Sequence, residues 1–597
     1  MSSDSRWSAL IQGMQSSHIN RRSMLRVMGV GSLGLLAACA SKSSDNQATT
    51  APTTASTTTG AGAATATTSG GATPSGSSAS PAASQAAATT PTPAGPAPKQ
   101  GGTLTIGLDQ EPPTMDPHAS PSAITFYITA STAESLLYLD GDRQIQPHLA
   151  ASYQVSTDGK SFTFKLNDGI TFQDDSKFDA NAVKFNFDRI VDPNFKAGGA
   201  LASLTGYTGT DVVDDMTAKV NFKDAFVPFL TYAAGGTLAM LSPTGTPKQG
   251  ADVNTTPITS GPYKLTEYVA KDHCTMERWD GYKRKAPWMS DAGPGYLDKV
   301  IWKFVPEAGT RTTTVESGET QMVDVVAGQD LSPLESNKDL KIMKKPWTGA
   351  PRIWMLNVTL APTDEVEVRQ AINYAIDKNA IVNTVFKGLG TPAIAPMTAA
   401  MLDDPSLRAY YPFDQNKAKQ ILDAAGWKGD SGIRQKDGKN LHLVLNAIDY
   451  GGGPEQTVIL IQGQLRDVGI DVEIKAQARP PWYEDNYKGA TNGPVLFLRS
   501  GDLDGLYSLF DSSVVGSNFG FSMLKDDSID QLLQQGREES DPTKRKAIYL
   551  QVEQKLMDMA VCVPLVDELS VFVMRQNVYG LQFNGYTYPV VAGCYLG

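Results

Sequence analysis

The sequence predicts a mixed α/β protein whose folded part begins near Lys99. Short runs of alternating apolar and polar residues indicate strands, and apolar residues at helical spacing indicate helices. In one segment, 441–476, the patterns follow one another as strand, helix and strand. At 597 residues, of which 41% are hydrophobic and 19% charged, the chain is long enough to bury several cores.

The first 38 residues have the features of an export signal. The pair Arg21 and Arg22 precedes an apolar run, 27–38, that is too short to span a bilayer. The arginine pair resembles a twin-arginine export signal, and Leu-Ala-Ala-Cys at 36–39 resembles the lipobox of bacterial lipoproteins. The resemblance implies that the chain is exported and that Cys39 is lipidated and becomes the new N-terminus.

Residues 39–100 are expected to be a disordered tether behind the lipidated cysteine. Between Asn46 and Pro98 the chain consists mainly of Ala, Thr, Ser, Gly and Pro, with no charged residue and no Leu, Ile, Val or Phe. Such a composition cannot bury enough apolar surface to offset the loss of chain entropy.

Two strands and a helix are predicted early in the folded part. Leu104, Ile106 and Leu108 alternate with other residues along 101–108, and 162–166 has the same pattern. A helix is predicted over 180–190, because apolar residues at 183, 187 and 190 share one face.

The segment 441–476 predicts a βαβ unit. A β-type run over 441–448 is followed by apolar residues at helical spacing between 458 and 468, and then by alternation over 470–474. Gly469 stands where the end of the helix requires a residue with positive φ. The two strands should therefore be parallel, with a right-handed crossover.

Three further helices have recognisable start signals. Asp364 is the expected N-cap of a helix that carries apolar residues between 368 and 376. Asp414 is the expected N-cap of a helix that carries apolar residues between 418 and 425 and ends at Gly426. Pro542 is the expected first residue of a helix that reaches 559.

Composition and missing motifs exclude several functions. A net charge of −11 without a concentrated basic stretch argues against nucleic-acid binding. Five scattered histidines and four cysteines without a CxxC pair indicate neither a metal site nor a cofactor. No nucleophile elbow, zinc-protease motif, phosphate loop or EF-hand loop is found, so an enzyme is not expected. A lipid-tethered hydrolase remains the alternative of another class, because distant residues can assemble a site that no local motif reveals.

Five collinear motifs resemble the peptide/nickel class (family 5) of extracellular solute-binding proteins of ABC importers, over about residues 100–590. The motifs are Gly-Gly-Thr-Leu at 101–104 with Met-Asp-Pro at 115–117, Ser-Gly-Pro-Tyr-Lys-Leu at 260–265, Val-Arg-Gln-Ala-Ile-Asn-Tyr-Ala-Ile-Asp at 368–377, 417–426 and 464–470.

The resemblance implies an α/β fold of the two-lobed periplasmic-binding-protein type, class II, with an additional domain inserted in the first lobe. The implied boundaries are 101–138, 258–350 and 569–597 for lobe I, 139–257 for the inserted domain and 351–568 for lobe II.

The resemblance also implies ligand-binding residues. The segment 498–518 looks like the one in which peptide-binding members carry an aspartate that pairs with the ligand's α-ammonium, and the match assigns this role to Asp502. Arg499 stands where peptide binders often have Trp, and it can offer a guanidinium fork to a carboxylate. The remaining candidates are the aromatic residues Trp354, Trp482 and Tyr483 and the polar Asn518.

Each candidate has a structural alternative. Asp502 can be a turn residue beside Gly501, and the aromatic side chains can belong to the core. The chain also departs from the dipeptide binders, because it has no arginine at 448–451, where they place one that binds the peptide carboxylate.

The function implied by the resemblance is the capture of a small solute, with an oligopeptide or dipeptide as the leading ligand, for the permease subunits of an ABC importer. Oligosaccharides, opines and metal chelates are alternative ligands, and a sensor that presents its ligand to a signalling partner shares the same features. The protein is expected to be a monomer, held by Cys39 on the outer face of the cytoplasmic membrane.

Three cysteines remain in the folded part, in a compartment where disulfides form. The resemblance places Cys274 and Cys594 in the first lobe, so these two are the preferred pair. Free thiols at these positions and at Cys562 are the alternative.

Overall fold

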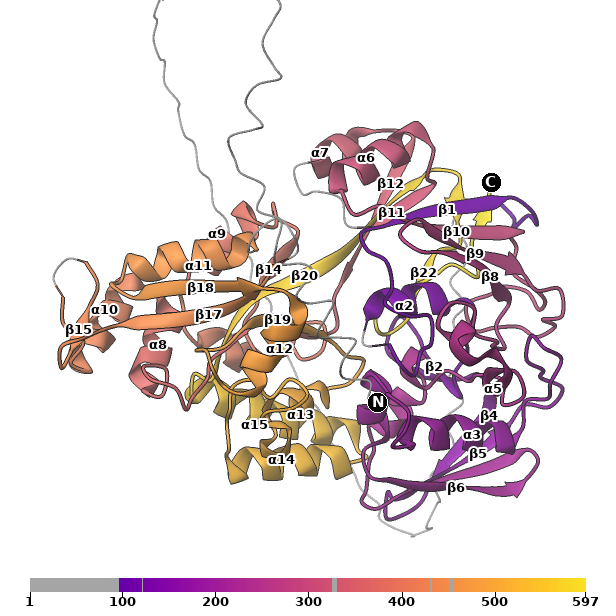
Figure 1. Ribbon diagram of the computed structural model, residues 1–597, viewed down its shortest axis with the longest axis horizontal. Helices are drawn as coiled ribbons and strands as arrows, with labels where there is room; N and C mark the ends of the chain where they lie inside the picture. The colour runs from indigo at the N-terminus through magenta and orange to yellow at the C-terminus, as the bar shows by residue number, and fades with distance from the viewer. Residues whose placement is uncertain (1–95, 121, 325–329, 430–431, 450–454) are drawn as a thin grey trace, which may run out of the picture. The chain divides into compact units, whose positions relative to one another are not determined.

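The computed structural model describes residues 96–597, except 121, 325–329, 430–431 and 450–454 (Figure 1). The expected export signal with Arg21 and Arg22, the lipidation site Cys39 and nearly all of the tether lie outside the described residues. Among the residues that the structure describes, no helix is both long and apolar enough to cross a membrane.

A ten-stranded sheet organises the fold, and β20 (Cys562–Arg575) joins its two halves (Figure 1). The strand order is β19 (Val495–Arg499), β13 (Gly349–Met355), β20, β11 (Met322–Asp324), β1 (Thr103–Leu108), β10 (Lys299–Phe304), β9 (His273–Arg278) and β8 (Tyr263–Val269), while β12 (Leu340–Pro346) and β14 (Gly390–Pro392) pair with β20. The first part of β20 pairs with β13 and β14, and its last seven residues pair with β12.

The predicted strand at 101–108 is confirmed as β1, which runs parallel to both β10 and β11. Its residues Leu104, Ile106 and Leu108 are fully buried in a core that also contains Trp302. Helix α2 (Ala123–Thr129) packs into this core, whereas α6 (Ala308–Ser317) and α7 (Leu331–Ser336) contribute to a smaller core with β11 and β12.

A separate four-stranded antiparallel sheet has the order β4 (Ala150–Val155), β5 (Ser161–Leu166), β7 (Thr217–Phe222) and β6 (Tyr207–Asp214). The predicted strand at 162–166 is β5, and the predicted helix at 180–190 is α3 (Ala180–Val191), which Asp179 caps. Phenylalanine rings from β5, α3 and α4 (Phe229–Tyr232) form a core of their own.

The predicted βαβ unit is confirmed. Strands β17 (His442–Ile448) and β18 (Asp471–Gln477) are parallel, and α11 (Gln456–Arg466) connects them. Gly469 follows the helix with φ 85°, as the sequence predicts.

The other expected helices form, with one different cap. Asp414 caps α10 (Gln415–Ala424), and Pro542 is the first residue of α15 (Pro542–Asp558). Helix α8 (Val366–Ala375) begins one residue later than a cap at Asp364 would place it, because Glu365 rather than Asp364 is its N-cap residue, and no side chain caps it.

The remaining elements include one longer helix, α14, and otherwise short helices and strands. They are β2 (Leu137–Leu139), β3 (Ile145–Pro147), α5 (Thr246–Gln249), α9 (Lys378–Thr384), β15 (Gln435–Lys436), β16 (Lys439–Asn440), α12 (Arg479–Tyr487), α13 (Gly505–Phe510), α14 (Asp527–Glu538), β21 (Val578–Tyr579), β22 (Gln582–Phe583), β23 (Pro589–Val590) and β24 (Tyr595–Leu596), besides 3-10 turns.

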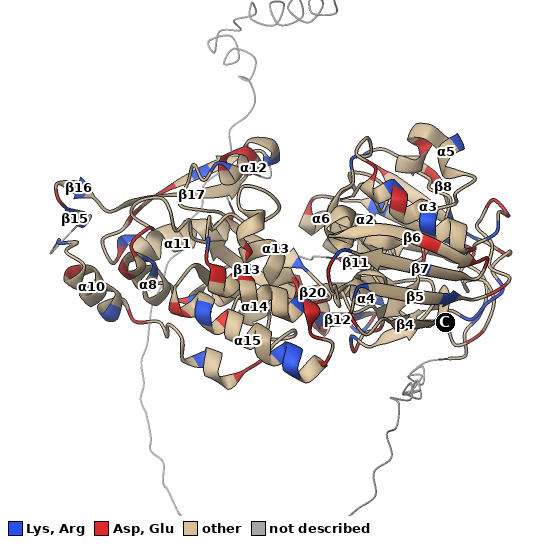
Figure 2. Cartoon of the chain, turned by 90° about the horizontal axis from the view of Figure 1, so that it is seen from below, with Lys and Arg blue, Asp and Glu red and all other residues tan. Residues whose placement is uncertain are grey.

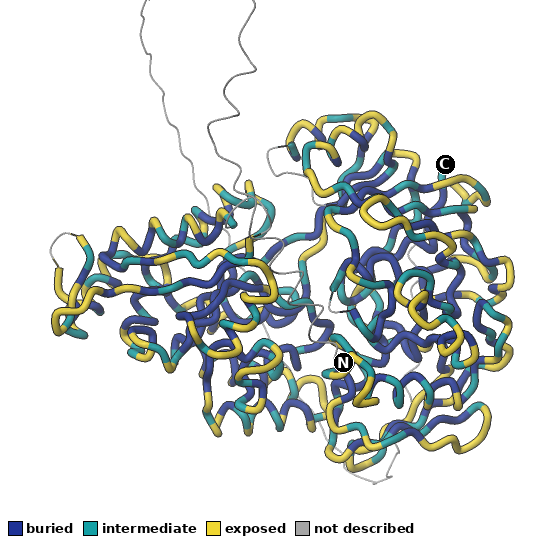
Figure 3. Tube along the Cα trace, viewed as in Figure 1, coloured by how far each residue is buried: buried dark blue, intermediate teal, exposed yellow. Residues whose placement is uncertain are grey.

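The central strand of the large sheet is mostly buried, and the helices carry charged residues. Figure 3 shows most of β20 as buried, and Figure 2 shows acidic and basic residues interspersed along helices such as α15.

The expected disulfide between Cys274 and Cys594 is wrong. Both residues lie in the apolar core around β1, and each is a buried free thiol, as is Cys562. Burial raises the pKa of Cys594 to about 12, so this thiol stays protonated and unreactive at neutral pH.

Two glycine substitutions test the packing of the second half of the sheet. Gly493 has φ 108°, and a Cβ at this position would overlap the carbonyl oxygen of Met355. Gly493→Ala should therefore lower the free energy of unfolding by at least about 2 kcal/mol. Gly463 lies inside α11 with open space around it, so Gly463→Ala should raise stability by about 0.5–1 kcal/mol. Urea denaturation of both variants measures the change in the free energy of unfolding. Equal changes in the two variants would contradict the positive φ and the close contact described for Gly493.

Candidate functional site

Arg499, at the end of β19, contacts residues from several distant parts of the chain. Its guanidinium carbon lies 3.6 Å from the ring centroid of Trp347. It donates hydrogen bonds to the hydroxyl oxygens of Thr587 (2.5 Å), Ser570 (3.2 Å) and Tyr127 (3.5 Å). Its buried Nε has no hydrogen-bond partner among the described residues. The side chain is thus held in place by an aromatic ring and hydroxyl groups, and it retains an N–H for a further acceptor.

Asp502 also lies where distant segments meet, but its carboxylate is already bound. Arg545 of α15 donates to both carboxylate oxygens, at 2.9 and 2.5 Å. Thr231 of α4 donates to Oδ2 at 3.1 Å, and the main-chain N–H of Asp504 donates to Oδ1 at 2.8 Å. Burial, the largest single effect, raises the pKa of Asp502, but the charge and hydrogen bonds of Arg545 together with the hydrogen bonds from Asp504 and Thr231 outweigh it, and the pKa is lowered.

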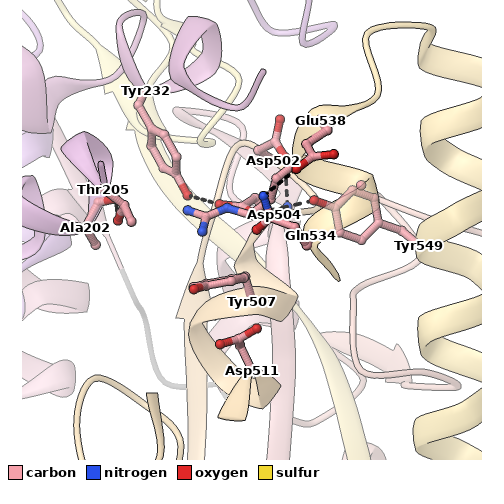
Figure 4. A network of polar contacts seen from close by, with 12 residues as sticks. Ala202, Thr205, Tyr232, Asp502, Asp504, Tyr507, Asp511, Gln534, Glu538 and Tyr549 are labelled. Carbon is pink, nitrogen blue, oxygen red and sulfur yellow. Dashed lines mark hydrogen bonds and ion pairs between the residues drawn. The ribbon is translucent and has the colours of Figure 1, made fainter. Parts of the chain in front are cut away.

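Asp504 forms the second half of this network, which Figure 4 shows from close by. Tyr232 donates to its Oδ2 at 3.1 Å, Tyr549 donates to its Oδ1 at 3.4 Å, and Arg537 forms an ion pair with it at 3.0 Å. Burial raises the pKa of Asp504 to about 6; the Arg537 charge opposes this rise, and the neighbouring Asp502 adds to it. The network joins α4 to α14 and α15, which are remote in sequence.

The other candidates have contacts of their own. Trp354 is fully buried, and its indole N–H donates to the carbonyl of Gly493 at 3.2 Å. Trp482 is 2% exposed and packs edge-on against Tyr483, with ring centroids 4.9 Å apart. Asn518 is exposed, in a turn with φ 49°. Contact of these four residues with a ligand stays a prediction.

Sequence reasoning missed most partners of Arg499 and Asp502. The tertiary fold brings Arg499 into contact with Trp347, Tyr127 and Thr587, which are remote from it in sequence. Arg545 lies 43 residues beyond Asp502, and no motif links the two. A signal available in the sequence was the tryptophan at 347, two residues before β13 begins at Gly349.

No group of three or more His, Cys, Asp or Glu that could hold a metal ion occurs within the described ranges. The contacts of Arg499, Asp502 and Asp504 described above are made by charged groups, hydroxyls and an aromatic ring.

The comparison with known families decides the assignment. Residues 144–514, more than half of the chain, match the family described as bacterial extracellular solute-binding proteins, family 5 Middle. The chain belongs to this family. The expected family and the two-lobed α/β fold are thereby confirmed, as is the general role of a solute-binding protein of ABC importers.

Similar proteins bind different ligands. The glutathione-binding protein GsiB of Escherichia coli (strain K12) is 28% identical over 478 residues, which cover 78% of this chain and 89% of that protein. Helicobacter pylori DppA, solved with the peptide STSA, has 22% identity and a TM-score of 0.71, covering 83% of this chain and 98% of that one. Brucella suis NikA, solved with Fe(III)-EDTA, has 24% identity and a TM-score of 0.72, covering 83% of this chain and all of that one.

The raised pKa of Asp504 predicts a pH dependence. The folded protein holds this proton up to about pH 6, whereas the unfolded chain releases it near 3.8. The contribution of the carboxyl group to stability is therefore complete below the unfolded pKa and falls by about 2–3 kcal/mol as the pH rises from 4 to above 6. Asp504→Asn removes this titration, so the stability difference between wild type and variant should change over that range. Urea denaturation between pH 4 and 7 measures it, and a difference independent of pH would contradict the assignment.

Proposed function

We propose that this family member is an exported lipoprotein that captures a small peptide for an ABC importer. The surroundings of Arg499 are the observation that supports a peptide as the ligand class. Its guanidinium lies over Trp347 and is held by hydroxyl groups, and its Nε–H has no acceptor in the described part of the chain. A guanidinium fixed in this way suits a carboxylate, which it can bind through two parallel hydrogen bonds. Peptides carry such a group.

The relatives support a peptide. Glutathione, which gives GsiB its name, is a small peptide with free carboxylates. Among the solved relatives, one is bound to the peptide STSA and another, from Bacillus subtilis, to a nonapeptide.

Opines and metal chelates are the second candidate class, because they also present carboxylates to Arg499. Solved relatives include AgaA with agropinic acid and NikA with Fe(III)-EDTA. In either case the proposed role is capture and release to the permease subunits, with no bond broken in the ligand.

Arg499→Gln should weaken peptide binding about 10- to 100-fold, because it removes charge-assisted hydrogen bonds to the carboxylate. Isothermal titration calorimetry of the mature chain with glutathione and with a panel of di- and tripeptides measures the affinity. Arg408→Gln removes an exposed arginine paired with Asp403 and is the matched control, which should bind as wild type does. Equal binding by both variants would exclude Arg499 as the carboxylate site.

Native mass spectrometry of the gently purified mature chain, repeated after denaturation, identifies any ligand that copurifies. A peptide mass supports the proposal, and an opine or chelate mass assigns the protein to the second class. Altered peptides after prolonged incubation would indicate an enzyme instead.

We also propose that Cys39 anchors the protein to the outer face of the cytoplasmic membrane. Cys39→Ser should move the protein from the membrane fraction to the soluble extracytoplasmic fraction, because no acyl chain is then attached. Replacement of both Arg21 and Arg22 by Lys should retain the precursor inside the cell. Fractionation and immunoblotting of the native host distinguish the two, and a Cys39→Ser protein that stays on the membrane would contradict the anchor.

A further inference from the structure

Two carboxylates meet at the carboxyl ends of the parallel strands β1 and β11. Asp109 follows the last residue of β1, and Asp324 is the last residue of β11. The main-chain N–H of Asp109 donates to Oδ1 of Asp324 at 3.1 Å. In open α/β sheets, ligands bind beyond the carboxyl ends of the strands, so the pair lies at the edge where a ligand is expected.

The two carboxylates lack full compensation. Asp324 is 2% exposed, and its buried Oδ2 has no hydrogen-bond partner within the described ranges; the same holds for Oδ1 of Asp109. A buried carboxylate oxygen without a donor is costly, and two neighbouring carboxylates repel one another. Arg311 donates to the main-chain carbonyls of Asp324 (3.1 Å), Val305 (2.6 Å) and Pro306 (2.9 Å).

Tyr127 connects this acidic pair to Arg499. Its hydroxyl accepts a hydrogen bond from Arg499 at 3.5 Å. Burial raises the pKa of Tyr127; the charge of Arg499 opposes this rise, and the charges of Asp324 and Asp109 add to it.

The pairing of the strands in the sheet also places the acidic pair close to Arg499. Asp324 pairs with Phe572 of β20, and Ser570, two residues earlier on β20, accepts a hydrogen bond from Arg499. Two residues of a strand span about 7 Å. The acidic pair and the guanidinium are therefore separated by a distance that a small zwitterion can bridge.

We propose that Asp109 and Asp324 bind the ammonium group of the ligand whose carboxylate Arg499 binds. This assignment rests on the proposed function and specifies its ligand as a zwitterion with a free primary amine. It places the ammonium at the acidic pair rather than at Asp502, whose two oxygens are both held by Arg545. An ammonium donates up to three hydrogen bonds, enough for both unpartnered carboxylate oxygens.

Binding of the ligand should also release a proton from the acidic pair. Burial raises the pKa of both aspartates, and Arg311 from α6, Gln110 beside Asp109, Tyr127 from α2 and Arg499 from β19 are the other charged or polar groups near them. A cation between the carboxylates favours their ionised form, so binding of an ammonium should release a proton. Affinity should accordingly rise with pH until the pair is ionised in the free protein.

The test compares a peptide with its N-acetylated form. The peptide is the tightest binder among glutathione and the di- and tripeptides, titrated by calorimetry into the mature wild-type chain. N-acetylation should lower the affinity of wild type at least 10-fold, and Asp109→Asn should reduce this discrimination to less than 3-fold. Asp298→Asn is the matched control. Asp298 directly precedes β10, at the amino ends of the parallel strands and therefore opposite the edge that holds the acidic pair.

The outcomes separate the two proposals. If no peptide binds wild type, the proposed function fails and this assignment fails with it. If peptides bind but Asp109→Asn discriminates as wild type does, only the assignment of the acidic pair is overturned. A loss of discrimination in Asp502→Asn, with Asp109→Asn unchanged, would place the ammonium at Asp502.

A second measurement does not depend on affinity alone. Calorimetry in two buffers of different ionisation enthalpy reports the protons released on binding, and wild type should release a proton that Asp109→Asn does not. Thermal unfolding without peptide shows that each variant is folded. Equal proton release in wild type and folded Asp109→Asn would overturn the assignment.

Discussion

The strand β20 is the constraint on which the rest of the structure depends. It is 14 residues long and mostly buried, and its main chain pairs with β13 and β14 in one half of the sheet and with β11 and β12 in the other. Because buried main-chain groups must be paired, the strand fixes the register of both halves at once. That register sets Ser570 beside Arg499 and Phe572 beside Asp324.

The charged residues of the candidate sites differ in role because their interaction partners differ. Asp502 and Asp504 are bound by arginines and hydroxyls from α4, α14 and α15, so they hold parts of the protein together. Arg499 instead donates to hydroxyl groups, which leave its positive charge uncompensated by a direct ion pair among the described residues. The pair Asp109 and Asp324 has the opposite charge and also lacks full compensation. A zwitterionic solute would neutralise both.

The relatives show how far the scaffold alone constrains function. Proteins with TM-scores of 0.70–0.72 to this chain were solved with a peptide, with agropinic acid and with Fe(III)-EDTA. The family match supports the solute-binding role, and the ligand class depends on a few side chains that the shared fold does not fix. For this chain, the side chains proposed for this role are the arginine at 499 and the acidic residues at the ends of β1 and β11.

The sequence by itself determined the local elements and the family. Alternating and helical periodicity identified β1, α3 and the βαβ unit, because each pattern is set by neighbours in the chain. It misassigned the cap of α8, which depends on local backbone geometry, and the pairing of Cys274 with Cys594, which depends on the tertiary fold. Only the tertiary structure decided that Asp502 is bound by Arg545 and that Asp109 meets Asp324, 215 residues away. Such contacts follow from sheet register and helix packing, which no periodic pattern encodes.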